Sequence, residues 1–136
     1  WDMCREMTAS GLVEIGSHGY AIHNLDGRMG NFVPGQANGV QRRKGESDTD
    51  FYCRVLDDLR YSFDRIAQET GAPPTFFAYP FGKTDPDADA YLEDLFPLTV
   101  VTGPGKYAAN LSKGLHQLPR FTVTMERSLA ALLKNT

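Results

Sequence analysis

The sequence predicts an α/β fold in which mostly parallel strands form a sheet and helices pack outside it. Segments with helical spacing of apolar residues alternate with short apolar runs, in the expected order α-β-α-β-α-β-β-α. The chain of 136 residues suits one domain, and 41% hydrophobic with 23% charged residues is the balance of a globular protein. These observations exclude a disordered chain and leave little room for a second domain.

The first part of the chain predicts a helix over residues 1–11, a short buried strand over 12–16 and a loop over 17–24. Trp1 already lies within the helical pattern, so the residue that would cap this helix is missing. The start also lacks an initiator methionine and the apolar stretch of a signal peptide. We therefore expect that the chain begins inside a longer protein or after processing.

The middle of the chain contains the clearest helix. Residues 25–46 form an irregular, glycine-rich stretch, and loops of that length are often functional or mobile. Ser47 or Asp48 can then cap a helix that ends at Gly71. Its apolar stripe consists of Tyr52, Val55, Leu56, Leu59, Phe63 and Ile66.

The second half predicts strands over 75–79, 98–102 and 117–123, a helix over 85–95 and a short helix over 125–133. About four strands are visible in all, whereas a closed barrel of parallel strands needs about eight. The sheet is therefore either small and open or the later part of a barrel. The missing helix cap at the start of the chain favours the barrel.

Charge and cysteine content exclude several classes of partner. The net charge of −3 argues against nucleic acid, and Arg42-Arg43-Lys44 is a basic run too short to change this, so we expect it to be a solvated loop. No run reaches the ~18 apolar residues that would span a membrane. Cys4 and Cys53 lack metal-site spacing, and we expect two unpaired thiols, with a bridge between them as the alternative.

Two histidines follow the predicted strand 12–16. His18 and His23 are five residues apart in a loop at the carboxyl end of that strand, where the crevice of α/β sheets lies. Both rings can turn toward one point, and a neutral imidazole is a good ligand for zinc and similar divalent ions. Histidines at close spacing are common, so the pair alone does not establish a metal site.

The second segment with chemical potential is Phe77-Ala78-Tyr79-Pro80-Phe81-Gly82. An aromatic strand that ends in proline and glycine is typical of a buried strand and its turn. The alternative is that the rigid turn holds backbone N–H groups toward a ligand, as an oxyanion site or as the wall of a sugar-binding groove.

Together these segments resemble the polysaccharide deacetylases, the NodB-like carbohydrate esterases. Residues 10–18 with His23 resemble the metal-binding stretch of the family, residues 77–82 its substrate-groove motif and residues 118–123 a late strand motif. The five-residue histidine spacing is closest to the branch that acts on poly-β-1,6-N-acetylglucosamine. The resemblance covers essentially the whole chain, and the combination of motifs is more specific than any one of them.

The resemblance implies an incomplete deformed (β/α) barrel, with residues 1–136 as the C-terminal portion of a single deacetylase domain. It also implies a divalent metal, usually zinc, held by His18, His23 and an aspartate. The backbone around Tyr79 would help to bind the oxyanion. The sugar groove would be lined by the turn residues Tyr79, Pro80, Phe81 and Gly82.

The sequence departs from the family in its aspartates. The family's Asp-Asp pair on an early strand, which gives the catalytic base and the third metal ligand, has no counterpart here. Asp57-Asp58 lies inside the amphipathic helix, and we expect it on or beside the solvent face. Asp85, Asp87 and Asp89 are expected to be a helix cap and exposed helix charges.

Other departures affect the two motifs directly. Gly19 replaces a usual threonine and Ala21 an aspartate often found in this branch, and both changes are expected to loosen the loop that orients His18. Ala78 stands where many members have an arginine that holds the catalytic aspartate. We expect Arg120 to supply that charge, and the alternative is an arginine paired on a sheet edge. His116 does not match the family's late histidine by spacing.

These features predict the later portion of a metal-dependent N-deacetylase that acts on an N-acetylated polysaccharide or oligosaccharide, in a parent protein at the bacterial cell surface. Without a catalytic base, the chain alone is not expected to be an efficient enzyme. One alternative is a carbohydrate- or partner-binding module on the same scaffold, and another is a different metal hydrolase completed by Asp26 or Glu46. An incomplete barrel also exposes a strand edge, so we expect self-association.

Overall fold

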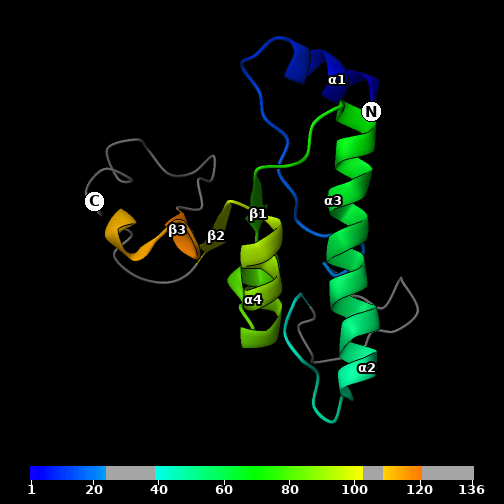
Figure 1. Cartoon of the computed structure of the whole chain (residues 1–136), viewed down its shortest axis with the longest axis vertical. Helices are drawn as coiled ribbons and strands as arrows, with labels where there is room; N and C mark the ends of the chain where they lie inside the picture. The colour runs from blue at the N-terminus through cyan, green and yellow to red at the C-terminus, as the bar shows by residue number, and fades with distance from the viewer. Residues whose placement is uncertain (24–38, 103–108, 121–136) are drawn as a thin grey trace, which may run out of the picture.

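A three-stranded parallel sheet lies beside the long helix of the molecule (Figure 1). The structure is a computed structural model that describes residues 1–23, 39–102 and 109–120. Strands β1 (Phe76–Ala78), β2 (Leu98–Thr102) and β3 (Leu118–Arg120) are neighbours in the order β1-β2-β3, and both pairs are parallel. The predicted parallel sheet is therefore confirmed for the described strands, and its third strand is described as far as residue 120.

The predicted strand over residues 12–16 is wrong. Leu12 and Val13 are exposed, and Ser17 alone makes a parallel bridge, with Phe77 of β1. The N–H of Ser17 donates to the carbonyl of Phe76 and the N–H of Ala78 donates to the carbonyl of Ser17, both at 2.9 Å. The backbone of the segment therefore pairs with the edge of the sheet only at Ser17, the residue just before His18.

The helices of the described residues follow the predicted order with one irregularity. The helix expected after residue 47 begins at its Ser47 cap and reaches Gly71, but a π-helical turn divides it. The elements are α1 (Asp2–Ala9), α2 (Asp48–Phe51), the π-helix η1 (Tyr52–Leu56), α3 (Asp57–Thr70), α4 (Pro86–Leu95) and the 3₁₀ turns η2 (Pro80–Gly82) and η3 (Leu111–Lys113). The predicted helix over 125–133 lies outside the described residues.

Helix α1 packs weakly. It buries no residue, and its N-cap Trp1 makes no side-chain capping hydrogen bond. Arg5 ties it to the C-terminal end of α3 through an ion pair with Glu69 at 2.9 Å, and the two helices lie against each other there (Figure 1). The two cysteines are unpaired: the free thiol of Cys4 is half-buried on this helix, and that of Cys53 is exposed.

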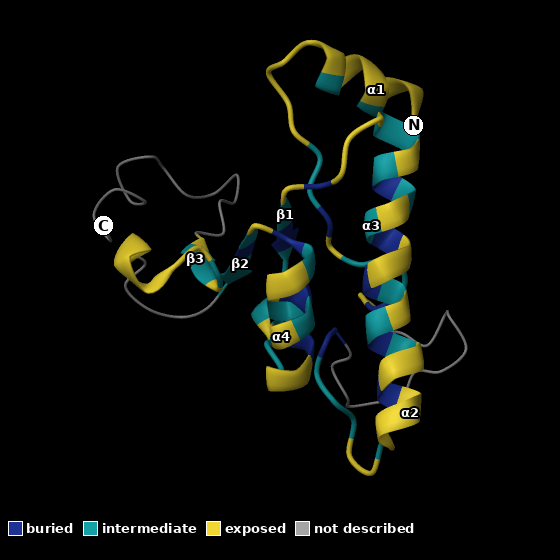
Figure 2. Ribbon diagram, viewed as in Figure 1, coloured by how far each residue is buried: buried dark blue, intermediate teal, exposed yellow. Residues whose placement is uncertain are grey.

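The core lies between the sheet, α4 and the helical run from α2 to α3. Buried positions recur at intervals along that run between exposed ones (Figure 2). Tyr52 is exposed, although the predicted apolar stripe includes it. The stripe assumes α-helical spacing, and the π turn η1 interrupts that spacing at Tyr52. The core residues are Ile22, Val40, Phe51, Val55, Leu59, Phe77, Tyr79, Ala88, Leu92 and Phe96.

Arginines hold the segment after residue 38 against the helices. Arg54 donates to both carboxylate oxygens of Glu46, at 2.6 and 2.8 Å, and to the carbonyls of Gly39 and Gln41. Arg42 pairs with Asp87 at 2.6 Å and lies over the ring of Phe51. In the basic run expected to be a solvated loop, Arg42 is therefore held in structural contacts, whereas Lys44 is exposed as expected.

Among the described helices, none is long and apolar enough to cross a bilayer.

Replacing Glu46 by glutamine is expected to lower the free energy of unfolding by about 1–3 kcal/mol at neutral pH, because the partly buried Arg54 then loses its charged partner. Arg54 keeps only the carbonyls of Gly39 and Gln41. Only 6% of the Glu46 side chain is exposed, against 15% for Arg54. The pKa of Glu46 lies below its ordinary value, chiefly because Arg54 donates a hydrogen bond to the carboxylate. This stabilisation exists above the unfolded pKa and is lost as pH falls through the lowered one.

Denaturant unfolding at a series of pH values measures this difference. The gap between the wild-type chain and Glu46→Gln should shrink on acidification. Asp64→Asn is a suitable control, because its ion pair with Arg60 is exposed on both sides and its removal should change little. A gap that stays constant down to acid pH would contradict the prediction.

Candidate metal and substrate site

The histidine loop, residues 17–23, lies at the carboxyl end of β1. Ser17 is buried, paired with β1 on one side and within 2.9 Å of the hydroxyl of Ser62 in α3 on the other. At the far end of the loop, the side chain of Ile22 is in the core and its carbonyl accepts from the N–H of Gly39 at 2.9 Å. Both ends are thus fixed, and the two histidines lie between them.

The structure brings His18 and His23 together, as the sequence predicts. Their ring centroids are 4.9 Å apart, and the ring of His23 stacks on Phe81 with centroids 4.2 Å apart and planes 17° from parallel. Nδ1 of His18 lies 2.6 Å from the carbonyl oxygen of Ala78. Because that oxygen only accepts, Nδ1 carries the proton, and Nε2 keeps its lone pair.

The surroundings of His18 favour the neutral ring that a metal requires. Partial burial lowers the pKa of His18, and the positive charges of His23 and Arg120 lower it further, against an opposing effect of the hydrogen bond to Ala78. Arg120 itself is exposed, at the end of β3 and in register with Thr102 of β2. Its charge therefore acts on the histidine site across the sheet.

The two imidazoles have the chemistry of a partial divalent metal site. A ligating histidine ordinarily donates its other ring N–H to a carbonyl or carboxylate, which is the arrangement of His18 with Ala78. In the described parts of the chain, no group of three or more His, Cys, Asp or Glu side chains is placed to hold a metal ion. The described residues therefore place two candidate imidazole ligands side by side, with no third candidate beside them.

The second motif forms a tight turn beside these histidines. The turn η2 lies on the end of β2, since a Cβ atom on Gly82 would come within 2.0 Å of the carbonyl oxygen of Thr102. Gly82 has a φ of 66°, and Phe81 also has a positive φ, of 59°, which is strained for a residue with a side chain. In this conformation the ring of Phe81 lies against that of His23. Pro80, the first residue of this turn, is buried.

Tyr79 does not lie where a sugar-contacting ring would. Its side chain is 1% exposed, packs edge-on against Phe77 and donates from its hydroxyl to Asp89 at 2.8 Å. Its N–H donates to the carbonyl of Val100 at 3.0 Å. This differs from the expectation that Tyr79 lines the groove, because Tyr79, directly after β1, places its ring in the core. Its burial and hydrogen bonds instead anchor the turn.

Two aspartates that the sequence interpretation placed in solvent are structural. Asp89 of α4 accepts from Tyr79 and from the side chain of Gln117, at 2.8 and 2.9 Å. Asp58 of α3 accepts from the N–H groups of Tyr20 and Ala21, at 2.8 and 2.6 Å. Burial is the largest influence on both carboxyls and raises their pKa values. Asp85 caps α4 as predicted.

The remaining candidates do not join the histidines. Glu46 is committed to Arg54, which removes it as the ligand of a different hydrolase site, and Asp26 lies outside the described residues. Nδ1 of His116 is buried with no hydrogen-bond partner in the described parts of the chain. Nothing in the structure places it beside the histidine pair.

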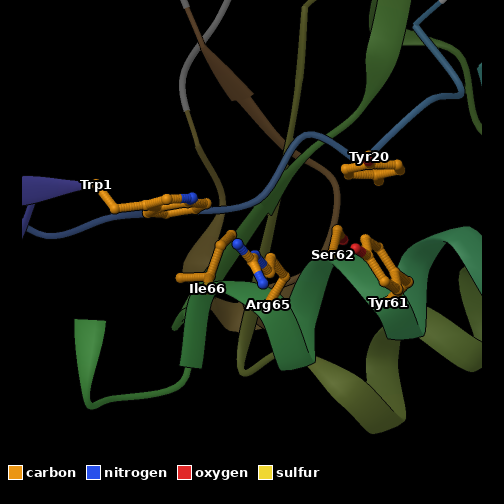
Figure 3. A pocket seen from close by; sticks show the side chains of 7 residues that line it. Trp1, Tyr20, Tyr61, Ser62, Arg65 and Ile66 are labelled. Atoms are coloured by element: carbon orange, nitrogen blue, oxygen red, sulfur yellow. The ribbon is translucent and has the colours of Figure 1, made fainter. Parts of the chain in front are cut away.

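The histidine loop also borders a hollow of about 450 Å³ above α3 (Figure 3). Tyr20 contributes its exposed ring to it and meets Tyr61 edge-on, with centroids 4.5 Å apart. The hollow is lined by Trp1, Gly19, Tyr20, Tyr61, Ser62, Arg65 and Ile66.

Comparison with known proteins gives one consistent result. The family model for polysaccharide deacetylase matches residues 1–97. The solved structure of a de-N-acetylase from Aggregatibacter actinomycetemcomitans has a TM-score of 0.76 and 23% identity over the whole of this chain and 52% of that one. None of the curated protein sequences compared with the chain matches it significantly.

Two further solved structures are similar. The BpsB deacetylase domain from Bordetella bronchiseptica is 27% identical, with a TM-score of 0.63 over 88% of this chain and 48% of that one. IcaB from Ammonifex degensii is 24% identical, with a TM-score of 0.54 over 74% of this chain and 39% of that one. The chain therefore spans about half the length of these structures or less. Their likeness confirms a fold of the deacetylase (β/α) barrel type, in which the described sheet is not closed.

The titration of His18 is expected to have its midpoint below that of an ordinary histidine, because burial and two positive neighbours disfavour its charged form. Arg120→Gln should move the midpoint upward, since it removes one of those charges. Arg60→Gln on the exposed face of α3 is the matched control and should leave it in place. Nitrogen-15 NMR of the imidazoles measures both the midpoint and the tautomer, and a neutral ring protonated on Nε2 would contradict the geometry.

Proposed function

The chain belongs to the polysaccharide deacetylase family, and we propose that it forms the C-terminal portion of the single catalytic domain of a metal-dependent polysaccharide N-deacetylase. The observation that carries the proposal is the paired placement of His18 and His23 at the end of β1, next to the strained turn of the second family motif. The substrate would be a polysaccharide or oligosaccharide that contains N-acetylglucosamine.

His18, through Nε2, and His23 would hold a divalent metal, which we propose to be zinc, with a third ligand from outside the described residues. When bound, such an ion supplies a Lewis acid for the acetyl carbonyl and an acidified water. The carbonyl of Ala78 keeps the proton of His18 on Nδ1, and Phe81 keeps the ring of His23 in place. The positive charge of Arg120 favours the neutral form of His18.

The turn η2 supplies the proposed oxyanion contact through its backbone. The N–H groups of Tyr79, Gly82 and Lys83 already donate within the protein, and Pro80 has none. We therefore assign the oxyanion contact to the N–H of Phe81, beside the ring that stacks on His23. The half-exposed ring of Phe81 would form part of the sugar groove. Tyr79 would support the turn from within the core and would not contact the sugar itself.

Zinc titration by calorimetry tests the metal site. We expect one zinc ion to bind per chain and binding to be lost in His18→Ala and in His23→Ala. His116→Ala is the matched control, because this histidine lies outside the pair and its removal should leave binding unchanged. Zinc that binds equally well to the wild-type chain and to both variants would contradict the proposed site.

Acetate release from N-acetylglucosamine oligomers tests the reaction. The 136-residue chain is expected to release no acetate at an enzymatic rate, whereas a protein extended by its upstream sequence should release it and lose that activity in His18→Ala. An extended protein that binds the oligomers without hydrolysis would make the scaffold a carbohydrate-binding module. From the family resemblance we propose a bacterial cell-surface location for the parent protein.

The isolated chain is also expected to self-associate. Among the described strands, β3 pairs with β2 alone, and such a parallel edge can pair with a second chain. Sedimentation velocity over a range of concentrations would show oligomers growing with concentration. A monomer at the highest concentration would contradict this expectation.

A further inference from the structure

Helix α3 supports the histidine loop along one of its faces. Asp58, Tyr61 and Ser62 are three and four residues apart, so their side chains share one side of the helix. Ser62 lies 2.9 Å from the hydroxyl of Ser17, and Tyr61 packs against Tyr20 (Figure 3). Asp58 makes the third contact, through a carboxylate, and it is the one that reaches the backbone between the two histidines.

The contact made by Asp58 is specific to the conformation of the loop. One carboxylate oxygen accepts from the N–H of Tyr20 at 2.8 Å and the other from the N–H of Ala21 at 2.6 Å. Both donors lie between His18 and His23 in the chain. Two consecutive N–H groups that point at one carboxylate fix the direction of the peptide planes, and hydrogen bonds to an ionised acceptor are among the stronger ones in proteins.

Gly19 makes this close approach feasible. Its φ is 83°, and a Cβ atom there would lie 2.4 Å from Cγ1 of Ile22 and 3.0 Å from Oδ1 of Asp58. A side chain at this position would therefore push the loop away from the carboxylate. The glycine and the aspartate are two parts of one arrangement, although they are 39 positions apart in sequence.

We propose that Asp58 is a positioning residue for the metal site: by holding the backbone of Tyr20 and Ala21 it sets the separation and orientation of the His18 and His23 rings. This inference rests on the proposed metal-dependent function, because it concerns how α3 supports the two proposed metal ligands. Asp58 touches neither imidazole, and it acts only through the loop.

The experiment compares zinc affinity in four forms of the full chain: wild type, Asp58→Ala, Asp58→Asn and Asp57→Asn. We expect Asp58→Ala to weaken zinc binding by about 10-fold to 100-fold, the usual effect of removing a group that orients metal ligands. Asp58→Asn keeps one acceptor oxygen and should lie between Asp58→Ala and wild type. Asp57→Asn alters the exposed neighbouring carboxylate and should bind zinc like wild type.

NMR on the metal-free chain gives an independent measurement. In the wild type, the amide protons of Tyr20 and Ala21 should be protected from exchange, and cross-peaks should connect the rings of His18 and His23. Both signals should be lost in Asp58→Ala and in Gly19→Ala while the dispersed spectrum of the folded core remains. A residue that merely stabilised the fold would change the fraction folded without altering these signals in the folded chain.

The outcomes separate this inference from the proposed function. If the wild-type chain binds no zinc, the proposed metal site fails, and the NMR signals still decide whether Asp58 positions the histidines. If Asp58→Ala is folded and keeps the wild-type zinc affinity or the His18–His23 cross-peaks, the inference is overturned. If the wild-type zinc affinity and the His18–His23 cross-peaks are both lost in Asp58→Ala and both kept in Asp57→Asn, the inference is supported.

Discussion

The parallel pairing of Ser17 with β1 fixes where the candidate histidines lie relative to the turn that follows β1. Two backbone hydrogen bonds, of 2.9 Å each, hold Ser17 between Phe76 and Ala78. They place the next residue, His18, beside the carbonyl of Ala78, and the turn that follows β1 places Phe81 under His23. Without that short pairing, no backbone hydrogen bond among the described residues would hold the histidine loop next to the turn η2.

The sequence predicts this fold well where local signals are strong. Asp85 before a proline marks the start of α4, Ser47 and Gly71 mark the limits of the long helix, and the aromatic run after residue 74 marks β1. It fails for residues 12–16, because a short apolar run looks the same whether it pairs with a neighbour or meets solvent. Sheet pairing is a long-range property, and spacing along the chain does not contain it.

The same limit explains which parts of the candidate site the sequence supplies. The histidine pair is predicted because both residues share one loop. Asp58 is missed because its partner Tyr20 lies 38 residues away in the chain. Asp89 is missed because its partner Tyr79, ten residues away, belongs to a different element and meets it only in the folded chain. On a helix an aspartate normally indicates a solvent-facing position, and only the packing of α3 and α4 on the loops reverses that expectation.

These two carboxylates show how the outer helices contribute to the site. Helix α3 holds the histidine loop through Asp58, and α4 holds the start of the turn η2 through Asp89, which accepts from the hydroxyl of Tyr79. Burial raises the pKa of each carboxyl, so each imposes an electrostatic cost on the fold. That cost is offset only while the N–H and O–H donors stay in place. A loop that moved away would give up these hydrogen bonds, so the N–H and O–H donors that offset the cost of burial also resist displacement of the two motifs.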